Sequence, residues 1–186
     1  MRVRLILSVL ALLALSAVSG CGSAAKSADS GGGTSPAGAV APAPAAASPT
    51  STPDLLVFTT VTIDRKPFAG VTLLGRPAVL WFWSAASAEC RAQAAETDKA
   101  AVLHGDRATV VGVAAAADPA ALREFVTSTG VGAFPHLADT SGDLWRRFGV
   151  TEPGTYVFLD AGGTVVHRGV LPRAEGLLVR TGELVG

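Results

Sequence analysis

Cysteine is scarce in this chain of 186 residues, which contains only Cys21 and Cys90. Because Cys21 lies near the N-terminus, the long remainder of the chain holds a single thiol and cannot close a disulfide within itself. Any redox cycle there must involve a second molecule. The three histidines are scattered, and none lies close to Cys90 in the sequence. Since thiol–imidazole metal sites use closely spaced ligands, the sequence predicts no metal site and no cofactor.

The chain also lacks an excess of charge of either sign. Fifteen lysine and arginine residues face fifteen aspartate and glutamate residues. No segment concentrates the basic residues into the patch that nucleic-acid binding requires. Nucleic acid is therefore not an expected partner.

A long apolar run is missing as well. The run at residues 5–18 is shorter than the roughly 20 residues that a membrane-spanning helix needs. It follows Arg2 and Arg4 and precedes small residues, which is the layout of a secretory signal peptide. We expect residues 1–20 to be this signal peptide, with an uncleaved signal anchor as the alternative. Cleavage would remove two basic residues and no acidic one, leaving a net charge of −2.

What is present at the end of this signal is the sequence VSGC, residues 18–21, which resembles a bacterial lipobox. The resemblance implies that Cys21 carries a multiply acylated anchor in the cell membrane, with the chain on the extracytoplasmic face. The residues that follow are almost entirely Gly, Ala, Ser, Thr and Pro, a composition that buries too little apolar surface to fold. We therefore expect residues 21–53 to be a lipidated cysteine and a flexible tether.

Residues 54–186 have a length that suits one domain with one core. β-Branched and apolar runs predict strands at residues 55–64, 77–83, 109–114, 155–159 and 164–167, with a short extended stretch at 134–137. Helix formers and capping residues predict helices at 88–104, 118–130, 143–148 and 174–184. This order predicts an α/β fold with a central mixed β-sheet flanked by helices.

From residue 55 onward the chain resembles the TlpA-like, membrane-anchored thiol–disulfide oxidoreductases of the thioredoxin superfamily, the redoxins. The strongest match is WFWSAASAECRAQ at residues 81–93, supported by FPHLAD at 134–139, LWRRFGV at 144–150 and the hairpin at 157–166. The resemblance implies a thioredoxin-like fold for the whole domain. It also implies thiol–disulfide exchange as the activity of the family.

The active-site motif departs from this family pattern. The resemblance implies a CxxC dithiol at a helix N-terminus, in which the first thiolate attacks a disulfide and the second resolves the mixed disulfide. Cys90 aligns with the second cysteine, and Ser87 occupies the place of the first. A serine hydroxyl stays protonated at neutral pH and cannot make this attack. Ala86 also replaces the tryptophan that usually precedes the first thiol.

The loop expected to face this site departs too. Family members carry a cis-proline just before the strand that here begins at Thr155. Pro153 lies about one residue early, and Gly154 falls at the expected place. The residues leave open whether the Glu152–Pro153 bond is cis. With two altered elements, we expect ordinary dithiol catalysis to be impaired.

Two hypotheses remain, and whether the chain is an enzyme stays open between them. In the first, the old active-site face binds a partner protein or peptide, with Ser87 marking the former nucleophile position and the contacts made by Trp83, Ala86, Glu89, Glu152, Pro153 and Gly154. In the second, Cys90 acts as a monothiol oxidoreductase or peroxidase that uses an external resolving thiol. Peroxiredoxins normally place a proline seven residues before the cysteine, and this chain has Trp83 there. We favour the binding hypothesis.

Overall fold

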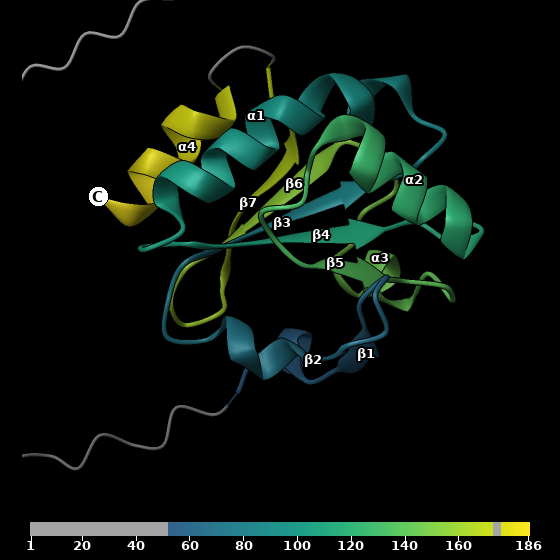
Figure 1. Cartoon of the computed structure of the whole chain (residues 1–186). Coiled ribbons are helices and arrows are strands. Elements are labelled where there is room, and N and C mark those ends of the chain that lie inside the picture. Colours follow the sequence, from purple (N-terminus) through teal and green to yellow (C-terminus); the bar gives the residue numbers. More distant parts are fainter. Residues whose placement is uncertain (1–51, 173–175) are drawn as a thin grey trace, which may run out of the picture. The chain divides into compact units, whose positions relative to one another are not determined.

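The computed structural model describes residues 52–172 and 176–186 (Figure 1). The predicted signal peptide, Cys21 and nearly all of the predicted tether lie outside these residues, so those predictions remain untested. The elements in chain order are η1 (Asp54–Leu56), β1 (Thr59–Val61), β2 (Pro67–Ala69), η2 (Gly70–Leu73), β3 (Ala78–Trp83), α1 (Ala88–His104), β4 (Thr109–Ala114), α2 (Pro119–Thr129), β5 (His136–Ala138), α3 (Asp143–Arg147), β6 (Thr155–Leu159), β7 (Val165–Val170) and α4 (Gly176–Val185).

The domain is built on a five-stranded sheet with the strand order β5-β4-β3-β6-β7. β3, β4 and β5 run parallel, whereas β6 and β7 are antiparallel to their neighbours. A separate two-stranded antiparallel sheet is formed by β1 and β2. The predicted central mixed sheet flanked by helices is confirmed.

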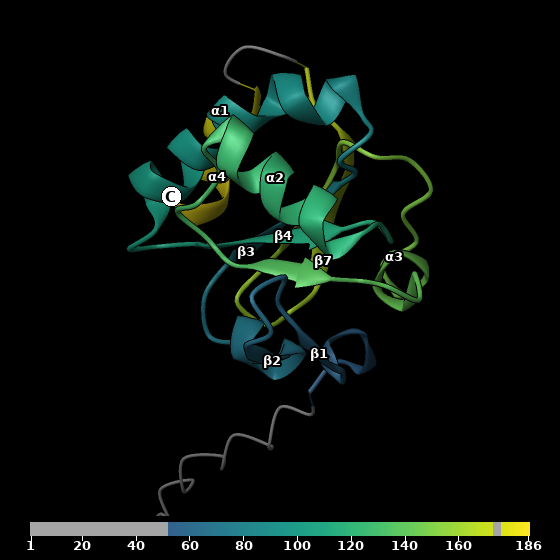
Figure 2. The same ribbon diagram turned by 45° about the vertical axis from the view of Figure 1, so that its right-hand side comes forward.

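β3 lies at the centre of the sheet, and all six of its residues are buried. Its side chains alternate between two cores because successive residues of a strand point to opposite faces. One core joins the odd-numbered residues of β3 to α1, α2 and α4. The other joins the even-numbered residues to the N-terminal segment and α3. Figures 1 and 2 show these layers, with α1, α2 and α4 above the sheet and the β1–β2 hairpin below it.

The helices begin and end where local chemistry predicts. Asp118 caps α2 by accepting a hydrogen bond from the Ala120 amide at 2.7 Å, and Pro119 occupies the first helical position. The same helix ends at Gly130, whose φ of 74° is accessible to glycine at little cost. The predicted ranges of α1 and β4 agree with the structure.

The prediction of one strand at residues 55–64 is wrong in detail. The segment forms η1 and the three-residue β1, and then turns into the unpredicted β2. Two backbone bonds close this turn, from the Arg65 amide to the Thr62 carbonyl and from the Thr62 amide to the Lys66 carbonyl, both at 2.8 Å. β-Branched composition indicates an extended chain and Arg65-Lys66-Pro67 indicate the turn that ends it, but no local pattern indicates the short β2 that follows.

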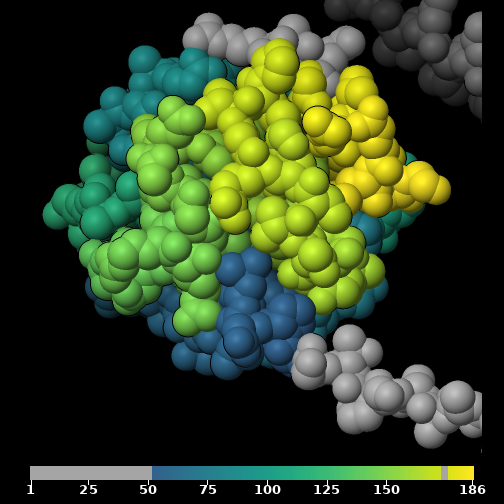
Figure 3. All heavy atoms as spheres, turned by 180° about the vertical axis from the view of Figure 1, so that it is seen from behind, coloured from purple at the N-terminus to yellow at the C-terminus, as the bar shows by residue number. Residues whose placement is uncertain are grey.

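The N-terminal turn is fixed to the rest of the domain. Leu56 is fully buried in the second core, and the Arg147 guanidinium donates to the Asp54 carbonyl at 2.7 Å. Figure 3 shows the corresponding surface from behind, where the blue N-terminal segment lies below the yellow-green segment that includes β7. Among the described residues, no helix is both long and apolar enough to cross a membrane.

Candidate functional site

The segment between β3 and α1 holds the first predicted site residue, Ser87. Its hydroxyl accepts a hydrogen bond from the Cys90 amide at 3.2 Å, which makes Ser87 the N-cap of α1. Its own amide donates to the Ser84 carbonyl at 3.1 Å. A capping serine satisfies a helix N–H that otherwise lacks a partner. The position that the resemblance assigns to a nucleophile is therefore occupied by a structural hydroxyl.

Cys90 lies one turn further along α1 and is fully buried in the core that contains Trp81 and Ala94. Burial is the main cause that raises the pKa of the Cys90 thiol; Ser87 lowers it in part, and the charge of Glu89 raises it further. Because the thiolate is the reactive form, this environment disfavours attack by Cys90 on a substrate disulfide. No second cysteine exists among the described residues.

Gln93 joins α1 to the loop that precedes β6. Its side-chain carbonyl accepts from the Trp81 indole N–H at 2.9 Å, and its amide donates to the Gly154 carbonyl at 3.0 Å. The Gly154 amide in turn donates to the Phe82 carbonyl at 2.8 Å. Gly154 has φ +90°, and a Cβ there would lie 3.0 Å from the Gln93 amide nitrogen. Glycine is therefore required for this close approach.

Sequence reasoning missed the role of Gln93, although the residue lies inside the motif at 81–93. A signal was available, because Gln93 follows Cys90 by three residues and so shares its helix face. An amide on a face that must be buried needs partners there. A buried pair continues the network one turn later, where the Thr97 hydroxyl and the Tyr156 hydroxyl are 2.7 Å apart. Burial raises the pKa of Tyr156.

Trp83, a predicted binding residue, is fully buried, so its side chain presents no surface to a partner in this conformation. Its indole N–H donates to Nδ1 of His136 at 3.1 Å, and Nε2 of His136 donates to the Val131 carbonyl at 2.6 Å. These two bonds assign the neutral Nε2–H tautomer to His136. Burial lowers the pKa of His136. Gly112 packs against both rings, and a Cβ there would lie 2.9 Å from the Trp83 indole nitrogen.

The remaining predicted binding residues gather at one edge of the sheet. Ala86, Glu152 and Pro153 are exposed, Glu89 is half-buried and Gly154 is buried. The loops that carry them meet because β3 ends where its antiparallel neighbour β6 begins, with Phe82 opposite Thr155. The Thr155 hydroxyl donates to the Glu152 carbonyl at 2.8 Å and steadies the second loop. We call the exposed and half-exposed residues of this edge, Ala86, Glu89, Glu152 and Pro153, the vestigial-site face. The isomer of the Glu152–Pro153 bond stays a prediction.

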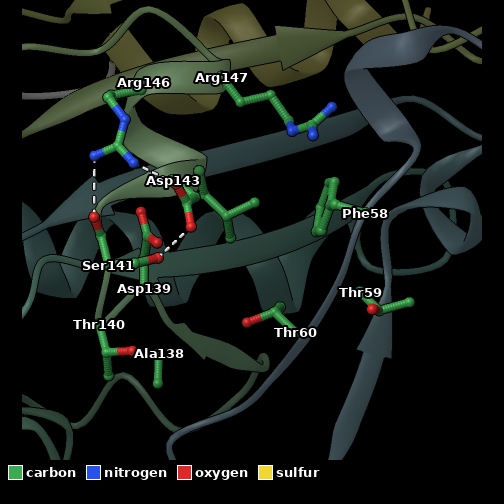
Figure 4. A pocket seen from close by; sticks show the side chains of 11 residues that line it. Phe58, Thr59, Thr60, Ala138, Asp139, Thr140, Ser141, Asp143, Arg146 and Arg147 are labelled. Atoms are coloured by element: carbon green, nitrogen blue, oxygen red, sulfur yellow. Dashed lines mark hydrogen bonds and ion pairs between the residues drawn. The ribbon is translucent and has the colours of Figure 1, made fainter.

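A cavity of about 710 Å³ opens between β1 and α3 (Figure 4). Its charged side chains are occupied within the chain. Arg146 pairs with Asp143 and donates to the Ser141 carbonyl, and Asp139 accepts from the Trp145 amide at 2.9 Å. None of the predicted site residues lines this cavity. Within the described ranges, no three His, Cys, Asp or Glu side chains cluster in a way that could hold a metal ion.

Comparison with known proteins agrees with this fold. Residues 40–181 match the Redoxin family. The soluble secreted antigen MPT53 of Mycobacterium tuberculosis and Mycobacterium bovis is 38% identical over 109 residues, which cover 59% of this chain and 62% of the relative. The match thus spans less than two thirds of the length of these curated relatives.

Two solved structures from Mycobacterium tuberculosis are also similar. The dsbF protein, described in mixed oxidized and reduced forms, gives a TM-score of 0.68 at 36% identity, covering 73% of this chain and all of that chain. A secreted disulfide oxidoreductase homologous to E. coli DsbE gives 0.63 at 33% identity, covering 70% and 96%. This chain therefore belongs to the Redoxin family and is a relative of the thioredoxin-like thiol–disulfide oxidoreductases.

Proposed function

We propose that this chain is an extracytoplasmic, lipid-anchored thioredoxin-like protein of the TlpA-like type whose dithiol site is redox-impaired. Its function is to bind a partner protein or peptide through the vestigial-site face. The observation that carries the proposal is the pair Ser87 and Cys90: a capping hydroxyl stands where the nucleophile would be, and the one thiol is fully buried.

Dithiol exchange needs an accessible thiolate to attack and a second thiol nearby to resolve the mixed disulfide. The Ser87 hydroxyl is too weak an acid to ionise at neutral pH, and it has no sulfur with which to form a mixed disulfide. Cys90 keeps the shielded place of a resolving thiol, and its raised pKa keeps it protonated. The described residues thus retain the framework of the family site without its attacking group.

Binding, in contrast, needs only a preorganised surface. The vestigial-site face has its two loops held by the Gln93 bridge and by the Gly154–Phe82 backbone bond. Ala86 and Pro153 offer small apolar contacts, and Glu152 offers a carboxylate at the exposed edge. Because these groups are positioned before a partner arrives, little ordering entropy is lost on binding.

The proposed location rests on two observations. The similar proteins MPT53 and the DsbE homologue are described as secreted. The VSGC sequence at residues 18–21 adds the lipid attachment site at Cys21. Mass spectrometry of the mature protein tests this anchor: an N-terminal peptide that begins with acylated Cys21 supports it, and an unmodified Cys21 contradicts it.

The test of the redox assignment is the reactivity of Cys90. The full chain carrying Cys21→Ser, extracted in a mild detergent, has Cys90 as its only thiol. We expect slow labelling by a thiol reagent in native buffer and fast labelling in denaturant, because the thiol is buried. We also expect no sulfenate after peroxide and no mixed disulfide after an oxidised peptide is added.

Fast native labelling together with a captured sulfenate or mixed disulfide would contradict the redox-impaired assignment. That result would favour the monothiol alternative, in which Cys90 borrows an external resolving thiol. The denatured sample is the internal control, since it shows that the same thiol is chemically intact.

A further inference from the structure

A groove runs between the β1–β2 connection and α2, beside β5. Two cavities of about 430 and 170 Å³ form it, and they share Thr62, Ile63 and Arg123 as lining residues. Figure 2 shows α2 on one side of β5 and the β1–β2 hairpin on the other. We call this feature the β1–α2 groove. None of the residues of the vestigial-site face lines it.

Apolar side chains line the groove and remain partly open to solvent. Val61 is 47% exposed, Pro119 and Pro135 are exposed, and Val126 is half-buried. When an occupant covers exposed apolar surface in a concavity, the free energy falls, so such a surface favours binding. The groove therefore offers apolar subsites along its length.

The rim is basic. Arg65 and Lys66 stand on one wall and Arg123 on the other, whereas Asp64 is the single carboxylate that lines either cavity. No salt bridge or side-chain hydrogen bond engages these three cations within the part of the chain that the structure describes. Of the nearby acidic groups, Asp98 faces the Ala133 amide, to which its carboxylate is bonded at 3.3 Å. The charge of the rim is thus available to an acidic partner.

Arg65 provides an independent observation. Its φ of +61° lies in the left-handed region, and it is the one non-glycine residue with positive φ in the described ranges. Glycine would adopt this turn at lower cost. A non-glycine residue in this region has a conformational cost, which a function of its side chain would offset. Here the side chain lines the groove.

From these observations we infer that the β1–α2 groove binds an extended, acidic peptide segment of a partner protein. Apolar side chains on one face of the segment enter the subsites, and carboxylates on the other reach Arg65, Lys66 and Arg123. A flat anionic bilayer fits less well, because it would meet the cations of the rim before it reached the concave apolar lining. The inference does not rest on the proposed function of the vestigial-site face.

The test uses the full chain in neutral detergent micelles and a fluorescent peptide of about ten residues that alternates glutamate and valine. Fluorescence anisotropy measures binding. We expect saturable binding that weakens as the salt concentration rises from about 0.05 to 0.5 M. A peptide with lysine in place of every glutamate is the matched control and is expected not to bind.

Variants locate the site. Arg65→Gly should raise the thermal unfolding midpoint while weakening peptide binding about three-fold, and Arg123→Gln should weaken binding by a similar factor. Arg107→Gln, an exposed cation outside the groove, and Glu152→Gln, on the vestigial-site face, should leave peptide binding unchanged. A higher unfolding midpoint together with weaker peptide binding in Arg65→Gly would distinguish a binding role of the Arg65 side chain from a structural one.

Three results would overturn the inference. The first is the absence of saturable binding to the acidic peptide. The second is an Arg107→Gln effect as large as that of Arg123→Gln, which would show that only overall charge matters. The third is displacement of the peptide by an anionic lipid added to the micelles, with lipid binding that depends on Arg65 and Arg123; this would identify a membrane contact instead.

Discussion

The side-chain atom at position 87, oxygen or sulfur, determines whether this residue can cap α1 well or can attack a disulfide. The hydroxyl oxygen is an acceptor for the Cys90 amide and completes the first turn of α1. A sulfur in its place would be a poorer cap but a competent nucleophile. The same position can therefore support either helix stability or exchange, and in this chain its hydroxyl caps α1.

Ser87→Cys is the direct test of this interpretation. We expect the introduced thiol to form a disulfide with Cys90 under oxidising conditions and the variant to gain thiol–disulfide exchange, because the substitution restores a CxxC pair at the N-terminus of α1. Loss of the serine cap should lower the free energy of unfolding by about 1 kcal/mol in the reduced protein. Thiol titration, a turnover assay with an oxidised peptide and chemical denaturation measure the three effects.

Ser87→Ala is the matched control, since it removes the same cap without adding a thiol. If Ser87→Cys stays as inactive as Ser87→Ala, the impairment does not lie at this residue. The other departures from the family pattern, Ala86 and the loop at Pro153 and Gly154, would then be the next positions to test.

Among the elements, β4 and β5 approach each other closely where Gly112 faces His136. The two residues are register partners, and Trp83 of β3 reaches across to the imidazole. Each strand contributes one part of this arrangement: an indole donor, a residue with no side chain, and an imidazole. The close packing of three strands depends on the absence of a Cβ at position 112.

Gly112→Ala should lower the free energy of unfolding by about 1–3 kcal/mol, because the added methyl group overpacks the buried rings and displaces the Trp83–His136 hydrogen bond. Gly132→Ala is the control, since a Cβ there meets nothing within 4 Å. Chemical denaturation compares the two variants. A Gly112→Ala protein as stable as the control would contradict this account of the strand contact.

Sequence reasoning succeeds for those elements whose signals are local. The buried run of β3, the Asp118–Pro119 cap and the stop at Gly130 are each written within a few residues, and the sequence predicts all three. It fails at β2, because a three-residue strand carries too little pattern to be read, although Arg65-Lys66-Pro67 does indicate the turn before it. For the site, the resemblance to the family motif identifies Ser87 and Cys90, and the buried strand itself implies the burial of Trp83. The bridging role of Gln93, in contrast, depends on the packing of α1 against the sheet.

For the molecule as a whole, the buried His136 links stability to pH. Its pKa in the folded state is lowered by burial, so the unfolded chain takes up a proton first as the pH falls below the ordinary histidine value of about 6.5. The free energy of unfolding should therefore decrease below that pH and level off once the folded pKa is passed. Protonation of Nδ1 also removes the acceptor for the Trp83 indole.

Urea denaturation at several pH values between about 7 and 5 measures the slope of the free energy of unfolding against pH. His136→Asn should reduce the slope, whatever its effect on absolute stability. His167 also has a pKa lowered by burial and by Arg180, so His167→Asn serves as a comparison that separates the two contributions. An unchanged slope in His136→Asn would show that His136 does not carry the effect.

The fixing of the N-terminal turn has a mechanical consequence. Leu56 is seated in the core and Asp54 is held by Arg147, both ahead of the first strand. A pulling force applied through the chain before residue 52 would act first on these two contacts. It would have to extract Leu56 from the core before it could separate β1 from β2. The N-terminal turn would thus take up the load first and leave the five-stranded sheet in place while the chain on its N-terminal side is pulled.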